Sequence, residues 1–394
     1  MASPWWSRDG LEVRDGRLHI AGRDAEEVAR EHGTPLYVYD SSRVETNFRR
    51  LAEALERADI RYRLLFALKA NRHPAILSRI RELGYVGIDA CSPNEVSAAL
   101  EAGWKAEEIS YTGTSLSRQD LDQILPHPLQ LNIDSMSALE KVGARCPGRT
   151  IGLRINPGVG EYSATLTSSG TKPTKFGIYP DQLEQALEVA RRCELRVRGL
   201  HFHMGSGWLH DDLPVFHDAV RRAAEMARQI AELEYVNVGG GIGVRLVESH
   251  RAPDLDAYAE GLAKHLNPLD TTVICEPGDF AVRDGGVFLV EVVGVDVKGG
   301  ATFVGVAAGF NAFAIPVLYQ DPQQVVVCRA ADAPATLTCA LAGHINEATD
   351  LLAEECSLPE VREGDILALL NAGGYGPGLA SHHCSRPHAA CLAL

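Results

Sequence analysis

Short apolar runs alternate with amphipathic segments through the first 280 residues of the chain. The runs are β-branched or leucine-rich and nearly continuous, as parallel strands buried on both faces are. They occupy residues 62–68, 85–90, 108–113, 129–134, 150–155, 196–202, 235–239 and 272–276. Helical periodicity lies between them, for example at residues 73–83, 93–103, 181–192, 213–233 and 255–266. Eight such strands over ~210 residues predict a single (β/α)8 barrel, an α/β fold.

The pattern changes near residue 281, where strand-like segments follow one another with short turns and few helices. These segments are residues 285–297, 302–308, 323–328, 336–345 and 365–371. They predict a second, mostly antiparallel β domain over residues 281–394. A strand-like stretch at 11–22 precedes the barrel. We therefore expect residues 1–35 to join the β domain and residues 36–280 to form the barrel.

Composition narrows the class of protein. A net charge of −14 argues against nucleic-acid binding, which needs a basic surface. The nine cysteines include no C-x-x-C pair, so we expect free thiols rather than a disulfide framework or a zinc site. No stretch reaches the ~20 apolar residues of a membrane span, and the N-terminus lacks a signal-peptide layout. These features favour a cytoplasmic enzyme of small molecules, with no metal, nucleic-acid or membrane partner.

Two charged residues directly follow strands of the expected barrel, whose catalytic groups lie at the carboxyl ends of its strands. Lys69 follows the first strand. A lone lysine is usually a solvated charge, but this position favours an ion pair or nucleophilic use. Glu276 ends the eighth strand, before a Pro-Gly pair that also occurs in plain surface turns.

Histidines and glycines occupy the same edge. His201 and His203 end the sixth strand and lie two apart, so both could face the barrel mouth. They could also be a metal pair or buried core residues, but no third metal ligand accompanies them. Gly239–Gly241 follow the seventh strand, where backbone N–H groups can approach an anion, although glycine runs are also common in turns. A lysine, an anion loop, an imidazole and a carboxylate together suit pyridoxal 5′-phosphate (PLP).

Several motifs occur in a fixed order along nearly the whole chain. They are GTPLYVYD (33–40), FALKAN (66–71), IDACSPNEV (88–96), TKFGI (174–178), GLHFHMGSG (199–207), VGGGIG (238–243), EPG (276–278), NAGGYG (371–376) and SRPHAACL (385–392). With these motifs the chain resembles the fold-type III PLP decarboxylases, and within them most closely the diaminopimelate decarboxylases. The resemblance implies an alanine-racemase-like barrel with a β domain.

The resemblance also implies roles for individual residues. Lys69 would bind PLP as a Schiff base, His203 would stack on the pyridine ring, and Glu276 would keep the ring nitrogen protonated. Glu95 would lie near Lys69. The full set of implied cofactor contacts is Lys69, Asp89, His203, Ser206, Gly239, Gly240, Gly241, Glu276, Gly278 and Tyr375. The implied substrate contacts are Asp279, Tyr319, His344, Glu347 and Tyr375.

Three positions depart from the family pattern. Asp279 stands where the family has the arginine of E-P-G-R, and Ile315 where it has the arginine of R-P-x-L-Y. Asn346 replaces the cysteine that gives a proton to Cα, so water, His344 or Tyr375 would have to donate it. Losing two cations and gaining an anion disfavours a distal carboxylate on the substrate. We therefore expect decarboxylation of an amino acid or derivative other than diaminopimelate, free or carrier-bound, in specialised biosynthesis.

Two other functions are compatible with these residues. A PLP racemase or epimerase, or other Cα chemistry, would exchange the α-proton without releasing carbon dioxide. A non-catalytic PLP-binding regulator would explain the lost cysteine and arginines, but not why Lys69, His203 and Glu276 are kept. The resemblance further implies a homodimer with shared active sites, in which residues 343–350 approach the partner's Lys69.

Overall fold

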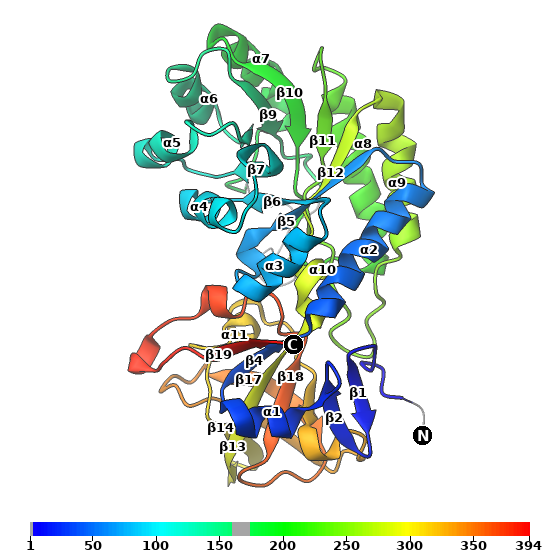
Figure 1. The fold of residues 1–394 in the computed structure, drawn as a ribbon, viewed down its shortest axis with the longest axis vertical. Coiled ribbons are helices and arrows are strands. Elements are labelled where there is room, and N and C mark those ends of the chain that lie inside the picture. The colour runs from blue at the N-terminus through cyan, green and yellow to red at the C-terminus, as the bar shows by residue number, and fades with distance from the viewer. Residues whose placement is uncertain (1–2, 160–173) are drawn as a thin grey trace.

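The computed structural model describes residues 3–159 and 174–394, and it shows a helix-wrapped barrel next to a β domain (Figure 1). Parallel strands close the barrel in the order β10-β11-β12-β5-β6-β7-β8-β9. These are β5 (Tyr62–Ala67), β6 (Val86–Ala90), β7 (Ile109–Thr112), β8 (Gln130–Ile133), β9 (Thr150–Arg154), β10 (Arg196–His201), β11 (Tyr235–Asn237) and β12 (Thr272–Cys275). Every one coincides with an expected apolar run, and the predicted fold class is confirmed.

Helices surround the barrel on its outer side (Figure 1). They are α2 (Ser41–Arg57), α3 (Pro74–Glu82), α4 (Pro93–Glu101), α5 (Arg118–Ile124), α6 (Met136–Gly143), α7 (Leu183–Arg192), α8 (Leu213–Ala227) and α9 (Leu255–Leu266). Their starts follow capping chemistry. The side chains of Asp40, Ser92 and Asp254 accept hydrogen bonds from the first-turn N–H groups of α2, α4 and α9. Helices α4 and α9 therefore begin after loops that follow barrel strands.

A tyrosine fills part of the barrel interior. The buried Tyr235 donates from its hydroxyl to Asn132 Oδ1 at 2.8 Å. Glycines make room for its ring, because a Cβ at Gly199 would lie 2.0 Å from the ring Cζ and one at Gly152 would lie 2.3 Å from the hydroxyl. The barrel is thus a packed core with a polar layer beneath its mouth.

The β domain is built around the long strand β13 (Gly286–Lys298), which pairs antiparallel with β14 (Ala301–Val306) and β18 (Ile366–Leu370). Its other strands are β4 (Leu36–Tyr39), β15 (Val325–Val327), β16 (Leu337–Ala342), β17 (Leu351–Leu358) and β19 (Ala390–Ala393). Two pairings, β14–β16 and β19–β4, are parallel. Since β4 pairs with β13, residues 36–39 lie in this sheet rather than in the barrel, a few residues beyond the expected boundary.

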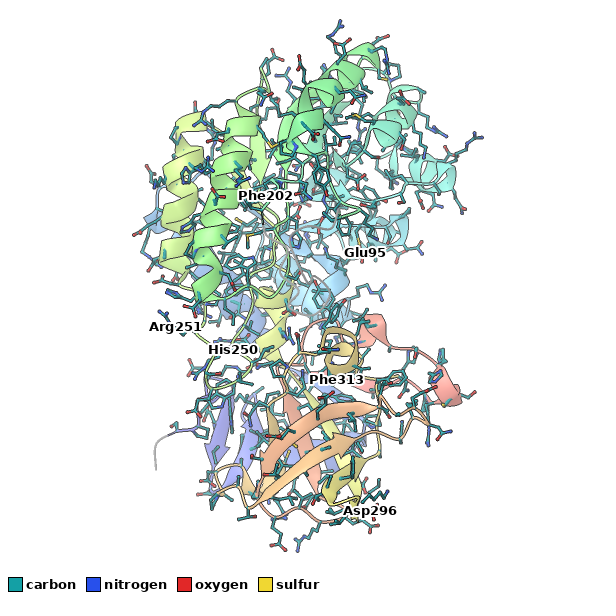
Figure 2. All side chains as sticks on the ribbon, turned by 180° about the vertical axis from the view of Figure 1, so that it is seen from behind. Glu95, Phe202, His250, Arg251, Asp296 and Phe313 are labelled. Atoms are coloured by element: carbon teal, nitrogen blue, oxygen red, sulfur yellow. The ribbon has the colours of Figure 1, made fainter. Side chains whose placement is uncertain are left out.

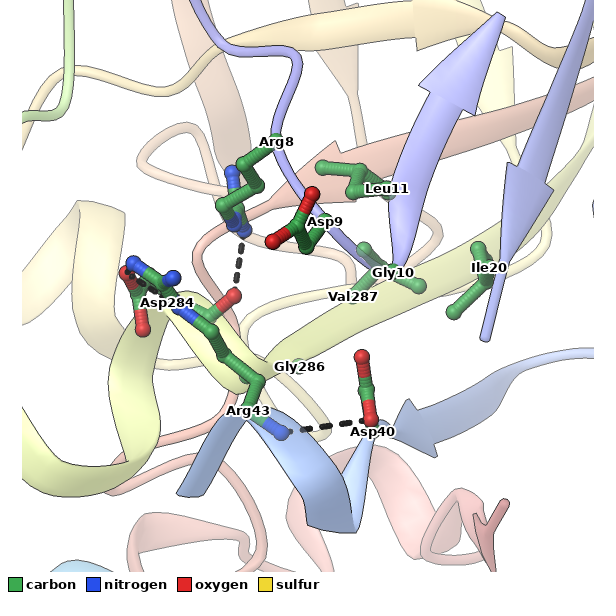
Figure 3. Close-up of a pocket in the computed structure, with 11 residues that line it drawn as sticks. Arg8, Asp9, Gly10, Leu11, Ile20, Asp40, Arg43, Asp284, Gly286 and Val287 are labelled. Carbon is green, nitrogen blue, oxygen red and sulfur yellow. Dashed lines mark hydrogen bonds and ion pairs between the residues drawn. The ribbon is translucent and has the colours of Figure 1, made fainter. Parts of the chain in front are cut away.

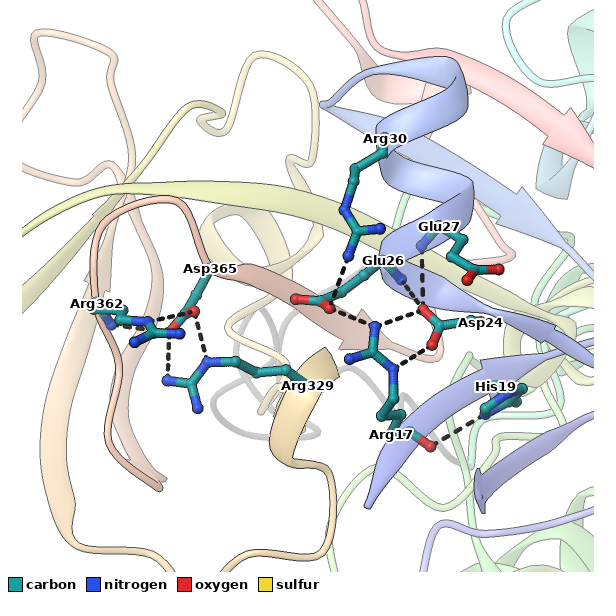
Figure 4. Close-up of polar contacts among 9 residues, drawn as sticks. All are labelled: Arg17, His19, Asp24, Glu26, Glu27, Arg30, Arg329, Arg362 and Asp365. Atoms are coloured by element: carbon teal, nitrogen blue, oxygen red, sulfur yellow. Dashed lines mark hydrogen bonds and ion pairs between the residues drawn. The ribbon is translucent and has the colours of Figure 1, made fainter. Parts of the chain in front are cut away.

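The N-terminal segment forms a small sheet of its own, followed by a helix. It contains β1 (Leu11–Arg14), β2 (Arg17–Ile20), β3 (Arg23–Asp24) and α1 (Ala25–His32). Arg17 holds it together by pairing with Asp24 and, at 2.6 Å, with Glu26 (Figure 4). The segment packs on the β domain through a shared apolar core rather than by strand pairing.

A buried charge cluster joins the two domains. The chain passes from β12 through the short helix α10 (Asp279–Val282) into β13. Just past α10, Asp284 accepts from Arg43 at 2.6 Å, and Arg8 donates to its carbonyl (Figure 3). Asp284 also accepts from Asn47 at 2.7 Å, and both Arg43 and Asn47 lie on α2. The helix α11 (Ile315–Tyr319) lies in the following domain. Within the described part of the chain, no helix is long and apolar enough to cross a membrane.

Candidate active site

A lysine and an aspartate meet at the carboxyl ends of the first two barrel strands. Lys69 follows β5 in a short 3₁₀ turn, and its Nζ lies 3.1 Å from Oδ2 of Asp89 in β6. The Lys69 side chain keeps 45% of its surface exposed, whereas that of Asp89 keeps 3%. Desolvation is the largest influence and lowers the pKa of Lys69, but Asp89, Tyr375, Cys91 and Glu276 together outweigh it and raise that pKa above its usual value. The amine is therefore accessible and held by a buried counter-charge.

The carboxylate of Glu276 is bound through both of its oxygens. His201 Nε2 lies 3.1 Å from Oε2, and Asn237 Nδ2 donates to Oε1 at 2.5 Å. All three side chains are buried. Burial alone would raise the pKa of Glu276, but these donors and Lys69 lower it below the usual range. Glu276 is thus an ionised group deep in the barrel mouth.

The glycine loop after β11 lies against the segment after β10. A Cβ at Gly240 would lie 2.1 Å from the carbonyl oxygen of Glu276, and one at Gly241 would lie 1.9 Å from that of Gly205. Gly239 and Gly241 have φ of +67° and +95°, which glycine adopts readily. The sequence uses glycine here because the backbones approach too closely for any side chain.

His203 lies beside this loop. Its Nε2 is 3.4 Å from Ser206 Oγ, and a Cβ at Gly239 would meet its Nδ1 at 2.9 Å. Burial lowers the pKa of His203 to about 3, so its ring is neutral at physiological pH. Phe202, between the two histidines, is fully buried (Figure 2). The structure therefore brings His203, Ser206 and the loop together on one side of the mouth.

Tyr375 reaches the mouth from the β domain. Its backbone N–H donates to Ala70 O at 2.7 Å, and its hydroxyl is 3.5 Å from where a Cβ at Gly278 would lie. Burial raises the pKa of Tyr375 to about 12, although Lys69 opposes the shift. The hydroxyl is therefore protonated at neutral pH, next to the lysine.

Asp279 forms an ion pair with Arg283, which lies four residues further along the chain. Arg283 donates to Asp279 Oδ2 at 2.9 Å and to Asp321 Oδ2 at 2.5 Å, and it is 6% exposed. The other oxygen, Asp279 Oδ1, is buried without a hydrogen-bond partner among the described residues. Ile315 is buried in α11. Counting Asp279 as an uncompensated anion therefore misjudged the charge of this region.

The segment after β16 lies apart from this group. Asn346 and Glu347 are exposed, and Glu347 Oε1 is 3.1 Å from His383 Nε2. The backbone N–H of His344 donates to Ala308 O at 2.9 Å. Glu95 accepts from the Cys91 N–H at 2.8 Å and acts electrostatically on Asp89, the partner of Lys69. Within this chain, no described hydrogen bond joins residues 343–350 to Lys69 or Glu276.

Some residues of the site were missed at the sequence level. Arg154 ends β9, and its guanidinium lies 4.4 Å from the centre of the Phe176 ring. Burial lowers the pKa of Arg154, while Asp134, Glu276 and Asp89 raise it. The strand-end rule that singled out Lys69 would also have found Arg154.

Over residues 3–159 and 174–394, no group of three or more acidic, histidine or cysteine side chains could hold a metal ion.

The family profile and the most similar relatives compared with this chain all belong to the pyridoxal-dependent decarboxylases. The profile of the family described as "Pyridoxal-dependent decarboxylase, pyridoxal binding domain" matches residues 41–283. A diaminopimelate decarboxylase of Methanothermobacter thermautotrophicus is 35% identical, covering 96% of this chain and 91% of that protein. One from Helicobacter pylori is 33% identical, covering 94% and 92%.

Solved structures agree with these relatives. The crystal structure of Helicobacter pylori diaminopimelate decarboxylase complexed with L-lysine has a TM-score of 0.85 and 32% identity, covering 94% of this chain and 93% of that one. A structure from Aquifex aeolicus has a TM-score of 0.87 and 29% identity, covering 98% and 93%. Lysine/ornithine decarboxylase of Vibrio vulnificus, at 21% identity and a TM-score of 0.81, shares the fold.

These comparisons correct one expectation and confirm others. The expected substrate other than diaminopimelate, in specialised biosynthesis, is wrong, because relatives 30–35% identical over nearly the whole chain are named diaminopimelate decarboxylases. The pairing of Asp279 with Arg283 balances the anion that the charge count treated as unpaired. The cofactor and the reaction class are confirmed. The chain belongs to the fold-type III pyridoxal-dependent decarboxylases and is a carboxy-lyase that uses pyridoxal 5′-phosphate.

Proposed function

We propose that this chain removes one carboxylate from diaminopimelate to give lysine. The observation that carries the proposal is the near full-length similarity to proteins named for that reaction. Loss of one carboxylate from diaminopimelate leaves lysine, and L-lysine is the ligand named for the Helicobacter pylori structure. The cytoplasmic location expected from the sequence stays a prediction.

The residues at the mouth fit PLP. The accessible amine of Lys69 suits its aldehyde, and the N–H groups of the loop at Gly239–Gly241, beside Ser206 and Tyr375, suit its phosphate. Gly278 has no side chain to fill the space between Ala67, Ala70 and Tyr375. When bound, PLP supplies a conjugated ring that accepts the electron pair left by the departing carboxylate. In this proposal Lys69 anchors the cofactor, His203 covers its ring face, and Glu276 keeps the ring nitrogen protonated.

Asp279 and Tyr319 provide contacts for the far end of the substrate, and Tyr375 acts near Lys69. Diaminopimelate carries a distal ammonium group as well as a distal carboxylate. The buried, unpartnered Asp279 Oδ1 can accept from an ammonium group, while Arg283 stabilises the charge through the other oxygen. Asp279 acts electrostatically on both Tyr319 and Tyr375, which places both hydroxyls in the same region. In this proposal Tyr375, which is protonated at neutral pH, supplies the proton to Cα.

A second copy of the chain would complete the site. The exposed Asn346 and Glu347, with His344 behind them, make no contact with Lys69 of their own chain among the described residues. In a homodimer with shared active sites they would reach the other copy's substrate, where the Asn346 amide orients rather than protonates. Sedimentation should then give twice the chain mass of 42.6 kDa, and a monomer of full activity would exclude shared sites.

The activity test compares diaminopimelate with a panel of amino acids. Purified protein loaded with PLP is incubated with meso-diaminopimelate, lysine, ornithine and arginine, and carbon dioxide and amine products are measured. We expect carbon dioxide and lysine from diaminopimelate, and none from a Lys69→Ala control. Turnover of another amino acid with none of diaminopimelate contradicts the proposal, and so does α-proton exchange without carbon dioxide.

A further inference from the structure

We propose that His201 is a positioning residue that keeps Glu276 ionised and fixed in place by donating a hydrogen bond to it. This inference rests on the proposed role of Glu276 opposite the cofactor ring nitrogen. His201 would touch neither cofactor nor substrate, and it would act only through the carboxylate.

Three neighbouring strands build this arrangement. His201, the last residue of β10, pairs in register with Asn237, the last residue of β11. Glu276 directly follows β12, and its backbone N–H donates to Gly239 O at 2.8 Å. The imidazole and the amide therefore approach the carboxylate from adjacent strands, one at each oxygen. Asn237 is itself held, because its Oδ1 accepts from the Gly239 N–H at 2.9 Å.

The protonation state of His201 follows from its surroundings. The ring is 2% exposed, and burial lowers its pKa. Glu276 opposes this shift and the cations of Arg154 and Lys69 add to it, and because the pKa stays below its ordinary value the ring is neutral at physiological pH. A neutral imidazole has one N–H, and a carboxylate only accepts. The proton therefore lies on Nε2, 3.1 Å from Glu276 Oε2.

This arrangement leaves the other ring nitrogen unsatisfied. His201 Nδ1 is buried and has no hydrogen-bond partner among the described residues. An apolar side chain of similar size would avoid that cost, so packing alone does not favour histidine here. The donated hydrogen bond is the feature that only a polar residue supplies.

A second carboxylate in the same mouth shows what the donors change. Asp89 is as buried as Glu276, but its Oδ1 has no hydrogen-bond partner among the described residues. Burial and the nearby Glu276 raise the pKa of Asp89, although Lys69 opposes them. The pKa of Glu276, with a donor at each oxygen, is lowered instead. Removing the hydrogen bond donated by His201 should therefore raise the pKa of Glu276, as the pKa of Asp89 is raised.

The test uses the protein without cofactor, so it does not depend on the proposed reaction. Infrared spectra at about pH 6, above the ordinary glutamate pKa of about 4.3, report whether a buried carboxyl group is protonated. We compare His201→Leu, which removes the donor, with His201→Gln, whose amide can replace it. Ser110→Ala is the matched control, since buried Ser110 bonds Asn132 in the same barrel and makes no described bond to Glu276.

Asp89, whose raised pKa is about 7, contributes a protonated-carboxyl band at this pH in every variant. We expect an additional band in His201→Leu that disappears when Glu276→Gln is added, and none beyond that of wild type in His201→Gln or Ser110→Ala. After loading, His201→Leu should bind PLP at least about tenfold more weakly, lower kcat more than it raises KM, and shift the pH midpoint of the visible cofactor band. An infrared spectrum and PLP affinity equal to those of Ser110→Ala would overturn the inference. If neither wild type nor any variant acts on diaminopimelate, only the proposed function is contradicted, because the infrared test uses neither cofactor nor substrate.

Discussion

Ion pairing at the barrel mouth controls how reactive the amine of Lys69 is. Asp89 holds the amine at 3.1 Å and raises its pKa, which stores it as the protonated form. The free amine, which attacks the cofactor aldehyde, is then a small fraction at neutral pH. The ion pair with Asp89 therefore orients the amine of Lys69 but lowers the fraction that is unprotonated and reactive.

Replacing Asp89 by Asn should therefore lower the pKa of Lys69. While most of the amine is protonated, the apoprotein should capture PLP roughly tenfold faster for each unit by which that pKa falls. The rate of adduct formation against pH measures this. Asp296→Asn, a remote exposed carboxylate on β13, should leave the profile unchanged (Figure 2). An Asp89→Asn profile that overlays wild type would show that the ion pair does not govern the amine.

Residues at strand ends were visible in the sequence, but their partners were not. Lys69, Glu276 and the two histidines were found because barrel strands end at the mouth. The bond between Asn237 and Glu276 joins residues 39 apart, and only the closed barrel brings them together. Arg283 was within reach of sequence reasoning, because an arginine four residues after Asp279 on a helix can pair with it. Counting two lost cations at Asp279 and Ile315, without the cation of Arg283, led to the wrong substrate.

At the scale of elements, the turn after β11 depends on close backbone approach. Gly241→Ala would place a Cβ 1.9 Å from Gly205 O, at a φ of +95°. Because backbone cannot move aside as a side chain can, the loop should shift and PLP should bind at least about tenfold more weakly, in line with 1.4 kcal/mol per factor of ten. Fluorescence titration of the apoprotein with PLP measures this affinity.

Gly299→Ala provides the control for that substitution. Gly299, in the turn between β13 and β14, has φ +60° and open space around its Cβ position. It should cost about 1 kcal/mol of stability from backbone strain and leave PLP affinity unchanged. Equal affinity in both variants would show that close packing of the Gly241 loop is irrelevant to the cofactor.

The triad of Arg283, Asp279 and Asp321, centred on the buried Arg283, ties α10 to the segment after α11. Arg283→Met would leave two carboxylates without their cation, and one of them, Asp279, has a buried oxygen. We expect a loss of about 3–5 kcal/mol in the free energy of unfolding, measured by urea denaturation. The exposed pair of Arg57 and Asp256 is the comparison, and Arg57→Met should cost at most about 1 kcal/mol. Similar losses in the two variants would contradict the burial argument.

The barrel strands were predictable element by element, and several other elements were not. Continuous apolar runs are distinctive because parallel barrel strands are buried on both faces. The helices α5 and α6 span only 7 and 8 residues, too short for a clear period. Strand β17 carries Glu354 and Glu355 at exposed positions, which breaks its apolar pattern. Strand β19 pairs with β4 from the opposite end of the chain, a contact that local sequence cannot reveal.

Over the whole molecule, buried neutral histidines link stability to pH. Burial lowers the pKa of His201, so in the folded state it stays neutral where the unfolded chain, with a pKa of about 6.5, takes up a proton. Stability is then complete above pH 6.5 and falls as the pH drops below it, because the unfolded state binds more protons. His203 acts in the same direction.

Urea denaturation of the apoprotein between about pH 7 and pH 5 should show this decline. In His201→Leu, the free energy of unfolding should depend less steeply on pH than in the Ser110→Ala control, by the equivalent of up to one proton. The depressed pKa of Glu276 works in a lower window, since its contribution is lost only as the pH falls below about 4.5. Asp89, whose pKa is raised to about 7, opposes this decline in the same window, so equal slopes in His201→Leu and Ser110→Ala would contradict neutral burial of His201.

The two domains meet where the chemistry is proposed. Lys69 comes from the barrel, and Tyr375 from the β domain donates to the carbonyl of the next residue, Ala70. The most direct test of the account is to reduce the PLP-loaded protein with borohydride and map the modified peptide by mass spectrometry. We predict a single adduct on Lys69, absent in Lys69→Ala. An adduct on another lysine, or none on a protein that still releases carbon dioxide from diaminopimelate, would contradict it.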